Sequence, residues 1–160
     1  MFVFDTSAYI NGWRDHYPPT TFPGVWTLIE ESFGDGRIVS PREVYNELTR
    51  KDDDVAAWVK ERLTGFVEPT AEVMRAAGAI FEEELPDSGN RDGADPWVIA
   101  EARMRGLTVV TYEGRTFSGV PTSERRWSRS MPGICKRLGV GCLTLPEALG
   151  QLGGTFGLDR

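Results

Sequence analysis

Short apolar runs, rich in β-branched and aromatic residues, alternate along this chain with stretches of helical periodicity, and this alternation limits the folds it can adopt. Residues 2–5 and 107–111 form the clearest runs, and shorter ones lie at 37–40, 66–67 and 140–143. Strands separated by helices pair in parallel, with helices on both faces of the sheet. We therefore expect an α/β fold, a single three-layer α/β/α domain with a mostly parallel central sheet of about five strands.

The predicted helices have apolar residues at helical spacing and recognisable ends. Ser40 and Pro41 are suited to an N-cap and a first helical turn, and Gly106 is placed to end a helix. The helices that we expect span residues 22–33, 41–50, 52–63, 70–81, 95–105, 132–138 and 146–152. The sequence has no internal repeat and no linker, so residues 1–152 are predicted to be one domain, with 153–160 as a C-terminal tail.

Charge is distributed unevenly over the 160 residues. The chain has a net charge of −6, but residues 113–137 hold six basic and two acidic residues, so this segment is +4 and the remainder −10. A net negative charge argues against a general nucleic-acid coat protein. A basic segment beside an acidic pocket suits an enzyme that holds phosphates with one part and a metal with the other, although a solvated loop has the same composition.

The rest of the composition favours an ordinary globular protein. Apolar residues make up 40% and charged residues 26%, and no apolar stretch approaches the roughly 20 residues that span a bilayer. The N-terminal residues lack the pattern of a secretory signal. Cys135 and Cys142 flank a glycine-rich turn and are expected to be reduced thiols rather than a disulfide. We therefore expect a cytoplasmic protein with no membrane partner.

Four acidic residues follow predicted strands or lie at helix ends. Asp5 closes the first apolar run, Glu47 lies late in the second predicted helix, Asp95 opens a largely apolar helix, and Glu113 follows the last long run. Reactive groups gather at the carboxyl ends of parallel strands. Each acid also has a structural interpretation, since Asp5 and Asp95 are suitable helix caps, and Glu47 and Glu113 are suitable surface residues.

Three further residues compete with these acids or would support them. Helical geometry places Glu47 at the border of the buried stripe and Glu43 further toward water, so Glu47 is the better candidate. Asp92, in the preceding loop, is a substitute for Asp95. Thr111 would hydrogen-bond a ligand carboxylate or a metal-bound water, and its place in a strand explains a β-branched residue equally well.

Taken in order, these motifs resemble the PIN domain, which is the nuclease fold of VapC-like toxins of prokaryotic toxin–antitoxin modules. The motifs are Asp5-Thr6-Ser7, Glu47-Leu48, Ala94-Asp95-x-x-Ile-Ala and Val109-Val110-Thr111-x-Glu113. The segments at 22–26 and 94–97 are similar to those of an uncharacterised bacterial and archaeal PIN-like subfamily. The resemblance covers residues 2 to about 152, so a PIN-like nuclease domain is expected there.

The resemblance implies a metal-dependent ribonuclease in which four acids hold Mg²⁺ or Mn²⁺ and Thr111 supports them. The acids that match the family's positions are Asp5, Glu47, Asp95 and Glu113. Glu113 departs from the family, in which aspartate is the common residue. Oxygen ligands suit these hard cations, and a bound cation removes the repulsion between converging carboxylates.

The resemblance also implies RNA as the substrate, the role of a toxin in a type II module, a cognate antitoxin as the protein partner, and a homodimer. Basic residues between 113 and 137 would contact the phosphates of that RNA, namely Arg115, Arg125, Arg126 and Arg129. Trp127 lies between arginines and would either stack on a base or pack against the core.

Other classes of function make different demands on the same residues. A non-catalytic PIN-like module would bind RNA or a protein without turnover and would tolerate Asp5→Asn. A phosphatase with an aspartyl nucleophile expects a second aspartate where the chain has Ser7. His16 is the only histidine, which excludes a two-histidine ribonuclease mechanism. A serine hydrolase would have to use that residue, in a turn-rich segment.

Overall fold

A parallel β-sheet forms the centre of the structure, which is a computed structural model that describes residues 1–85, 93–113 and 128–153. The sheet has five strands in the order β3-β2-β1-β4-β5, and every neighbouring pair is parallel. The strands are β1 (Phe2–Phe4), β2 (Ile38–Pro41), β3 (Phe66–Val67), β4 (Thr108–Val110) and β5 (Cys142–Leu143). The prediction of an α/β fold with a mostly parallel sheet of about five strands is confirmed.

β1 lies in the middle of the sheet because it pairs on both sides. Val3 is opposite Val39 of β2 and opposite Val109 of β4. The chain proceeds outward from β1 through β2 to β3, and then returns to form β4 on the other side of β1. The connections therefore diverge between β1 and β4, and such a point in a parallel sheet leaves a crevice at the carboxyl ends of the two strands.

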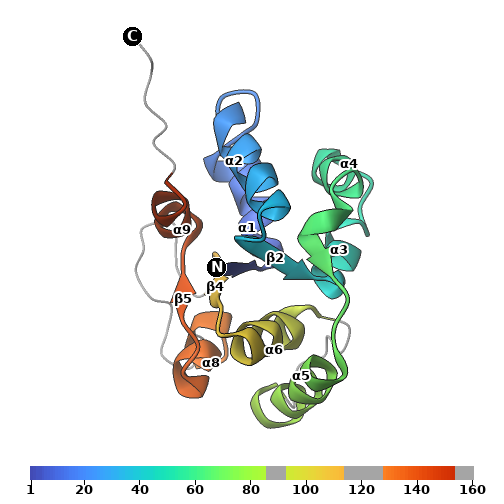
Figure 1. Cartoon of the computed structure of the whole chain (residues 1–160), viewed down its shortest axis with the longest axis vertical. Coiled ribbons are helices and arrows are strands. Elements are labelled where there is room, and N and C mark those ends of the chain that lie inside the picture. The colour runs from blue at the N-terminus through green and yellow to red at the C-terminus, as the bar shows by residue number, and fades with distance from the viewer. Residues whose placement is uncertain (86–92, 114–127, 154–160) are drawn as a thin grey trace.

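Helices cover both faces of this sheet (Figure 1). One face carries α5 (Ala71–Glu84), α6 (Asp95–Arg105) and α8 (Met131–Leu138), and the other carries α1 (Thr6–Asn11), α2 (Pro23–Gly34) and α9 (Leu145–Gln151). α3 (Arg42–Leu48) packs on β2 and β3, and α4 (Asp54–Lys60) packs on α3. A π-helical turn, Gly12–His16, follows α1, and a 3₁₀ turn, Leu63–Gly65, precedes β3. The expected three layers are present.

The core includes a short chain of buried hydrogen bonds that the sequence pattern did not reveal. Tyr9, Phe4 and Ser40 are buried, the Tyr9 and Ser40 hydroxyl oxygens lie 2.8 Å apart, and Ser40 donates to the Phe4 carbonyl oxygen at 2.8 Å. Buried polar groups require such partners. The prediction of Ser40 as an N-cap was wrong, because its hydroxyl serves the core, while Pro41 ends β2 and precedes α3.

Two other helix ends agree with their residue types, and a third does not. The Thr70 hydroxyl accepts a hydrogen bond from the Val73 amide at 3.3 Å, and Gly106 ends α6 with a φ of 66°, which glycine adopts without strain. The capping interpretation of Asp95 was wrong. Ala94 is the N-cap of α6 and Asp95 is the first helical residue, so the Asp95 carboxylate makes no capping hydrogen bond.

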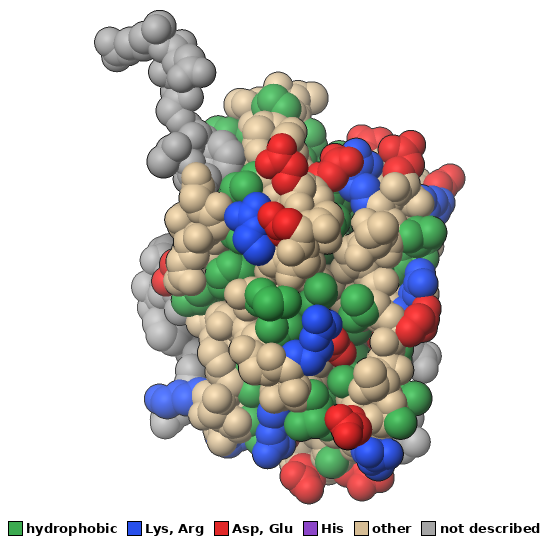
Figure 2. All heavy atoms as spheres, in the orientation of Figure 1, with side chains coloured by type: hydrophobic (Ala, Val, Ile, Leu, Met, Phe, Trp, Pro, Cys, Tyr) green, Lys and Arg blue, Asp and Glu red, His purple; other side chains and the backbone are tan. Residues whose placement is uncertain are grey.

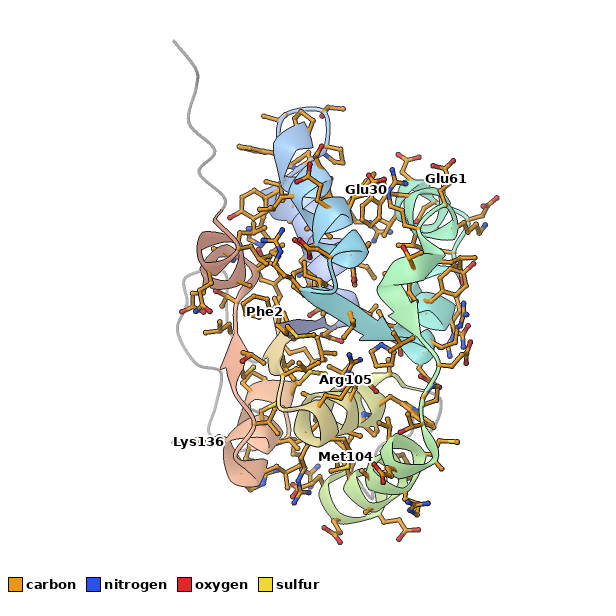
Figure 3. All side chains as sticks on the ribbon, viewed as in Figure 1. Phe2, Glu30, Glu61, Met104, Arg105 and Lys136 are labelled. Atoms are coloured by element: carbon orange, nitrogen blue, oxygen red, sulfur yellow. The ribbon has the colours of Figure 1, made fainter. Side chains whose placement is uncertain are left out.

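The face of the molecule in Figures 2 and 3 belongs to the amino-terminal edge of the sheet. Figure 3 labels Phe2, where β1 begins, and Arg105, where α6 ends before β4. Basic and acidic side chains are interspersed over this face (Figure 2). The carboxyl ends of the strands, and the acids that follow them, therefore lie at the opposite edge. Within the described ranges, no helix is long and apolar enough to cross a membrane.

Candidate metal centre

Asp5 lies directly after β1, at the point where the connections of the sheet diverge. Its side chain is 2% exposed. The Oδ2 atom accepts hydrogen bonds from the Ser7 hydroxyl at 2.7 Å, from the Thr111 hydroxyl at 2.9 Å and from the Ser7 amide at 3.3 Å. Burial raises the pKa of Asp5 above its usual value, and these hydrogen bonds oppose the increase. Asp5 thus caps α1 and is also a buried carboxylate at the carboxyl end of β1.

Two hydroxyl groups join the carboxyl ends of β1 and β4. The Ser7 and Thr111 hydroxyl oxygens lie 3.0 Å apart, and both bond Asp5. The Ser7 hydroxyl accepts from the Tyr112 amide at 2.9 Å, and that of Thr111 accepts from the Glu113 amide at 3.0 Å. This network fixes the backbone on which Glu113 is carried.

Glu47 bridges two segments that are far from it in the sequence. Its Oε2 atom accepts a hydrogen bond from the Thr6 hydroxyl, and its Oε1 atom accepts from the Ala94 amide at 3.0 Å. Thr6 follows Asp5 in the chain and Ala94 precedes Asp95. Glu47 therefore lies between the two aspartates.

Glu43 does not lie where helical geometry placed it. The expectation that it points toward water was wrong, because its Oε2 atom is buried with no hydrogen-bond partner among the described residues. Burial raises its pKa, and the charges of Glu68 and Glu101 raise it further. Glu101 is itself buried and pairs with Arg105 at 2.8 Å. Glu43 is thus directed to the environment of Glu101, away from the Glu47 contacts.

Asp95 is the acid whose ionisation is most affected by the others. Burial is the main cause that raises its pKa to about 8. Three negative charges raise it further, those of Asp5, Glu113 and Glu47. The four acids predicted from the sequence therefore come within electrostatic range of one another.

Glu113 approaches the same group but also contacts α8. Its Oε2 atom accepts a hydrogen bond from the Met131 amide at 3.1 Å, which satisfies the first amide of that helix. Burial raises the pKa of Glu113, the charge of Asp5 raises it further, and the Met131 hydrogen bond opposes both. The longer glutamate side chain is what allows this acid to reach α8 from β4.

The chemistry of these side chains suits a hard divalent cation. For Asp95 and Glu113, every charge that shifts the pKa is negative in the described part of the chain. A cation would remove this repulsion, and carboxylate and hydroxyl oxygens are ligands for Mg²⁺ or Mn²⁺. Within the described ranges, no three acidic, histidine or cysteine side chains already form a coordination shell. The donor set fits, and the side chains need rearrangement to surround an ion.

The predicted phosphate contacts lie mostly outside the described residues. Arg129 is described and exposed. Arg115, Arg125 and Arg126 lie outside the described residues, as do Asp92, the substitute for Asp95, and Trp127.

Sequence reasoning missed the residues that hold the acids in place. Thr6 and Ser7 each bond one of them, and only their position after Asp5 in the motif signalled a role. His16 was assigned to a turn-rich segment, but it ends the π-helical turn and stacks on Tyr112 with 4.5 Å between the ring centroids. The histidine thus packs beside the strand end that carries Thr111 and Glu113.

Fold and site together define an α/β protein with a group of carboxylates at the divergence point of a parallel sheet. Residues 2–156 match the family described as "Domain of unknown function (DUF4411)", and since the match covers most of the chain, the protein belongs to this family. A search of curated proteins found no match. The family description names no activity, so a functional proposal must rest on the residues themselves.

Proposed function

We propose that this protein is a metal-dependent nuclease of the PIN type that hydrolyses phosphodiester bonds in RNA. The observation that carries the proposal is that the charges of Asp5, Glu47 and Glu113 raise the pKa of Asp95, so that four acids act on one place in the fold. Carboxylates gathered in a buried crevice cost free energy unless a cation compensates them. The resemblance of the motifs to PIN domains supports the same proposal independently.

The acids would hold one or two Mg²⁺ or Mn²⁺ ions, with Asp5, Glu47 and Asp95 as the principal ligands. When bound, the cation lowers the pKa of a water molecule and neutralises charge on the scissile phosphate. Thr6, Ser7 and Thr111 orient the carboxylates through hydrogen bonds, so their task is positioning. Glu113 also accepts a hydrogen bond from the Met131 amide, and both oxygens of Glu47 accept hydrogen bonds within the protein.

The RNA would be held by basic side chains and the activity controlled by a protein. Arg129, with Arg115, Arg125 and Arg126, would bind phosphates. The PIN resemblance supports a cytoplasmic toxin of a type II toxin–antitoxin module, a cognate antitoxin that occupies the acidic crevice, and a homodimer. These roles depend on the nuclease activity, so the nuclease activity is tested first.

A second candidate is a non-catalytic module that binds RNA or a protein. One observation favours it: Asp5 and Glu113 each use an oxygen in hydrogen bonds within the protein, so the described side chains form no ready coordination shell. In that case the acids would serve the fold, and neutralising one of them would leave the binding function in place.

The deciding experiment measures cleavage of RNA by the purified chain with Mg²⁺ or Mn²⁺ and with EDTA. Asp5→Asn and Asp95→Asn are expected to lower the rate by at least about 100-fold, because each removes a ligand charge. Asp52→Asn is the control, since the Asp52 side chain is 99% exposed. Cleavage in EDTA, or full activity of both variants, would show that the metal mechanism is wrong.

A further inference from the structure

A hollow on the helical layer of the fold is not used by the proposed mechanism. It lies between α5 and α6, has a volume of about 200 Å³, and is lined by Ala77, Gly78, Phe81, Glu82, Pro96 and Trp97. Pro96 and Trp97 directly follow Asp95 in α6. The hollow therefore begins at the helical turn that carries one of the four acids.

The lining combines aromatic walls with open space. Phe81 and Trp97 are each half-buried and come from the two different helices. Gly78 is exposed, and a Cβ atom added to it would meet nothing within 4 Å. A residue with no side chain thus keeps one side of the hollow open.

Size and charge limit what this hollow can bind. Drug-sized ligands occupy pockets of about 300–1,000 Å³, so a smaller group is the better fit. Glu82 is the one ionisable group of the described lining, and its negative charge repels a phosphate. A flat, uncharged ring with N–H donors on its edge suits both the aromatic walls and the carboxylate.

We propose that this hollow binds a nucleobase of the RNA next to the scissile phosphate, and that guanine is preferred. The base would stack on Phe81 or Trp97, as bases do on aromatic side chains in proteins that bind single strands. Guanine presents two parallel donors on its Watson–Crick edge, which a carboxylate such as Glu82 accepts together. The inference rests on the proposed function for the identity of the ligand, because Asp95 would place the phosphate beside the hollow.

The test measures RNA binding without turnover. Fluorescent oligouridines that carry one central guanosine, or one abasic ribose in its place, are titrated with the full chain in Ca²⁺. Gly78→Leu fills the hollow, and we expect it to weaken binding of the guanosine RNA about tenfold without affecting the abasic RNA. Gly150→Leu is the matched control, because Gly150 is also an exposed helical glycine with open space around it.

A second pair of variants tests the preference for guanine. Glu82→Gln replaces a double acceptor, so it should reduce the preference for guanosine over uridine at least threefold. Glu83→Gln removes the same charge from the exposed neighbour outside the lining and should leave the preference unchanged. Equal affinities of the wild-type and Gly78→Leu proteins for the guanosine RNA would overturn the proposal, and an apolar side chain of a protein partner would then be the remaining occupant.

The outcome is separable from that of the nuclease proposal. If the protein distinguishes guanosine from abasic RNA but cleaves nothing in Mn²⁺, the base site is supported and the nuclease proposal is wrong. If the protein cleaves RNA but its RNA binding does not depend on Gly78 or Glu82, the nuclease proposal is supported and the base site is wrong. Thermal unfolding of each variant confirms that the fold is intact.

Discussion

The hydroxyl group of Thr6 donates a hydrogen bond to the Oε2 atom of Glu47, which lies 41 residues further along the chain. The other oxygen of the same carboxylate is held by the amide of Ala94. The orientation of the Glu47 carboxylate therefore depends on the segment that follows Asp5 and on the segment that precedes Asp95. A change in either neighbour should move this acid without removing it.

Thr6→Val tests this dependence. The substitution keeps the shape of the side chain and removes the donor, so Glu47 should lose its fixed orientation and Mn²⁺ should bind about tenfold more weakly. Calorimetric titration with Mn²⁺ provides the measurement. Thr27→Val is the control, since among the described residues its hydroxyl bonds only the Pro23 carbonyl of its own helix. Unchanged affinity in Thr6→Val would mean that Glu47 is not a ligand.

Replacement by alanine should destabilise the protein at one buried or half-buried serine and not at another. The Ser7 hydroxyl donates to Asp5 and accepts from the Tyr112 amide, so Ser7→Ala should lower the free energy of unfolding by about 1–3 kcal/mol. Ser32 is buried, and its hydroxyl has no partner among the described residues, so Ser32→Ala should be neutral or stabilising. Urea denaturation measures both, and a larger loss for Ser32→Ala would contradict the contacts described above.

The pH dependence of stability should report the ionisation of Asp95. Its pKa is about 8 in the folded protein against 3.8 for an ordinary aspartate, so the folded state binds more protons between these values. The free energy of unfolding of the metal-free protein should therefore fall as the pH rises through this range. An asparagine at position 95 cannot ionise. The free energy of unfolding of Asp95→Asn, measured relative to that of the wild type, should therefore increase by at least about 1 kcal/mol between about pH 5 and about pH 8.

Urea denaturation in EDTA at the two pH values measures that difference, and Asp52→Asn serves as a control. Addition of Mg²⁺ or Mn²⁺ should also stabilise the wild type more at the higher pH, because protons compete with the cation for the carboxylates. Parallel pH profiles for the wild type and Asp95→Asn would show that the pKa of Asp95 is not raised in the folded protein.

A pair of glycines tests the packing between α2 and the 3₁₀ turn. A Cβ atom at Gly65 would lie 2.6 Å from the Phe33 ring, so Gly65→Ala should destabilise the fold by about 2 kcal/mol or more. A Cβ atom at Gly34 meets nothing within 4 Å, and Gly34→Ala should stabilise the helix by up to about 1 kcal/mol. Thermal unfolding compares the two, and equal effects would be inconsistent with the close approach at Phe33.

Much of the fold could be predicted from the sequence because strand and helix leave different apolar periodicities. The buried runs around Val3 and Val109 are β-branched and short, whereas α5 and α6 carry apolar faces over several turns. The failures arose from contacts between distant segments. The sequence predicted Ser40 to be a helix cap, but its hydroxyl is hydrogen-bonded to Tyr9 and to the Phe4 carbonyl. Residues next to Ser40 in the sequence do not predict these contacts.

The candidate site was predictable in its acids and not in their arrangement. An aspartate after a strand is visible in the sequence, and Asp5 was found in this way. The orientation of Glu43 depends on the space beside Glu101, which lies 58 positions later in the sequence. The angle of Glu43 around its own helix does not predict a contact with so distant a residue. For the same reason the contact of Glu113 with Met131 could not be anticipated, because it depends on where α8 packs.

The central position of β1 has a consequence for the order of synthesis. β1 leaves the ribosome before either of its two partners, and one of them, β4, follows it by about 100 residues. Domains fold as units once the segments that pair have emerged. One edge of β1 therefore stays unpaired until β4 has been synthesised. Asp5 cannot lie beside Asp95 and Glu113 before that point. On the proposed function, a nascent chain carries no complete set of acids and leaves intact the messenger RNA from which it is being translated.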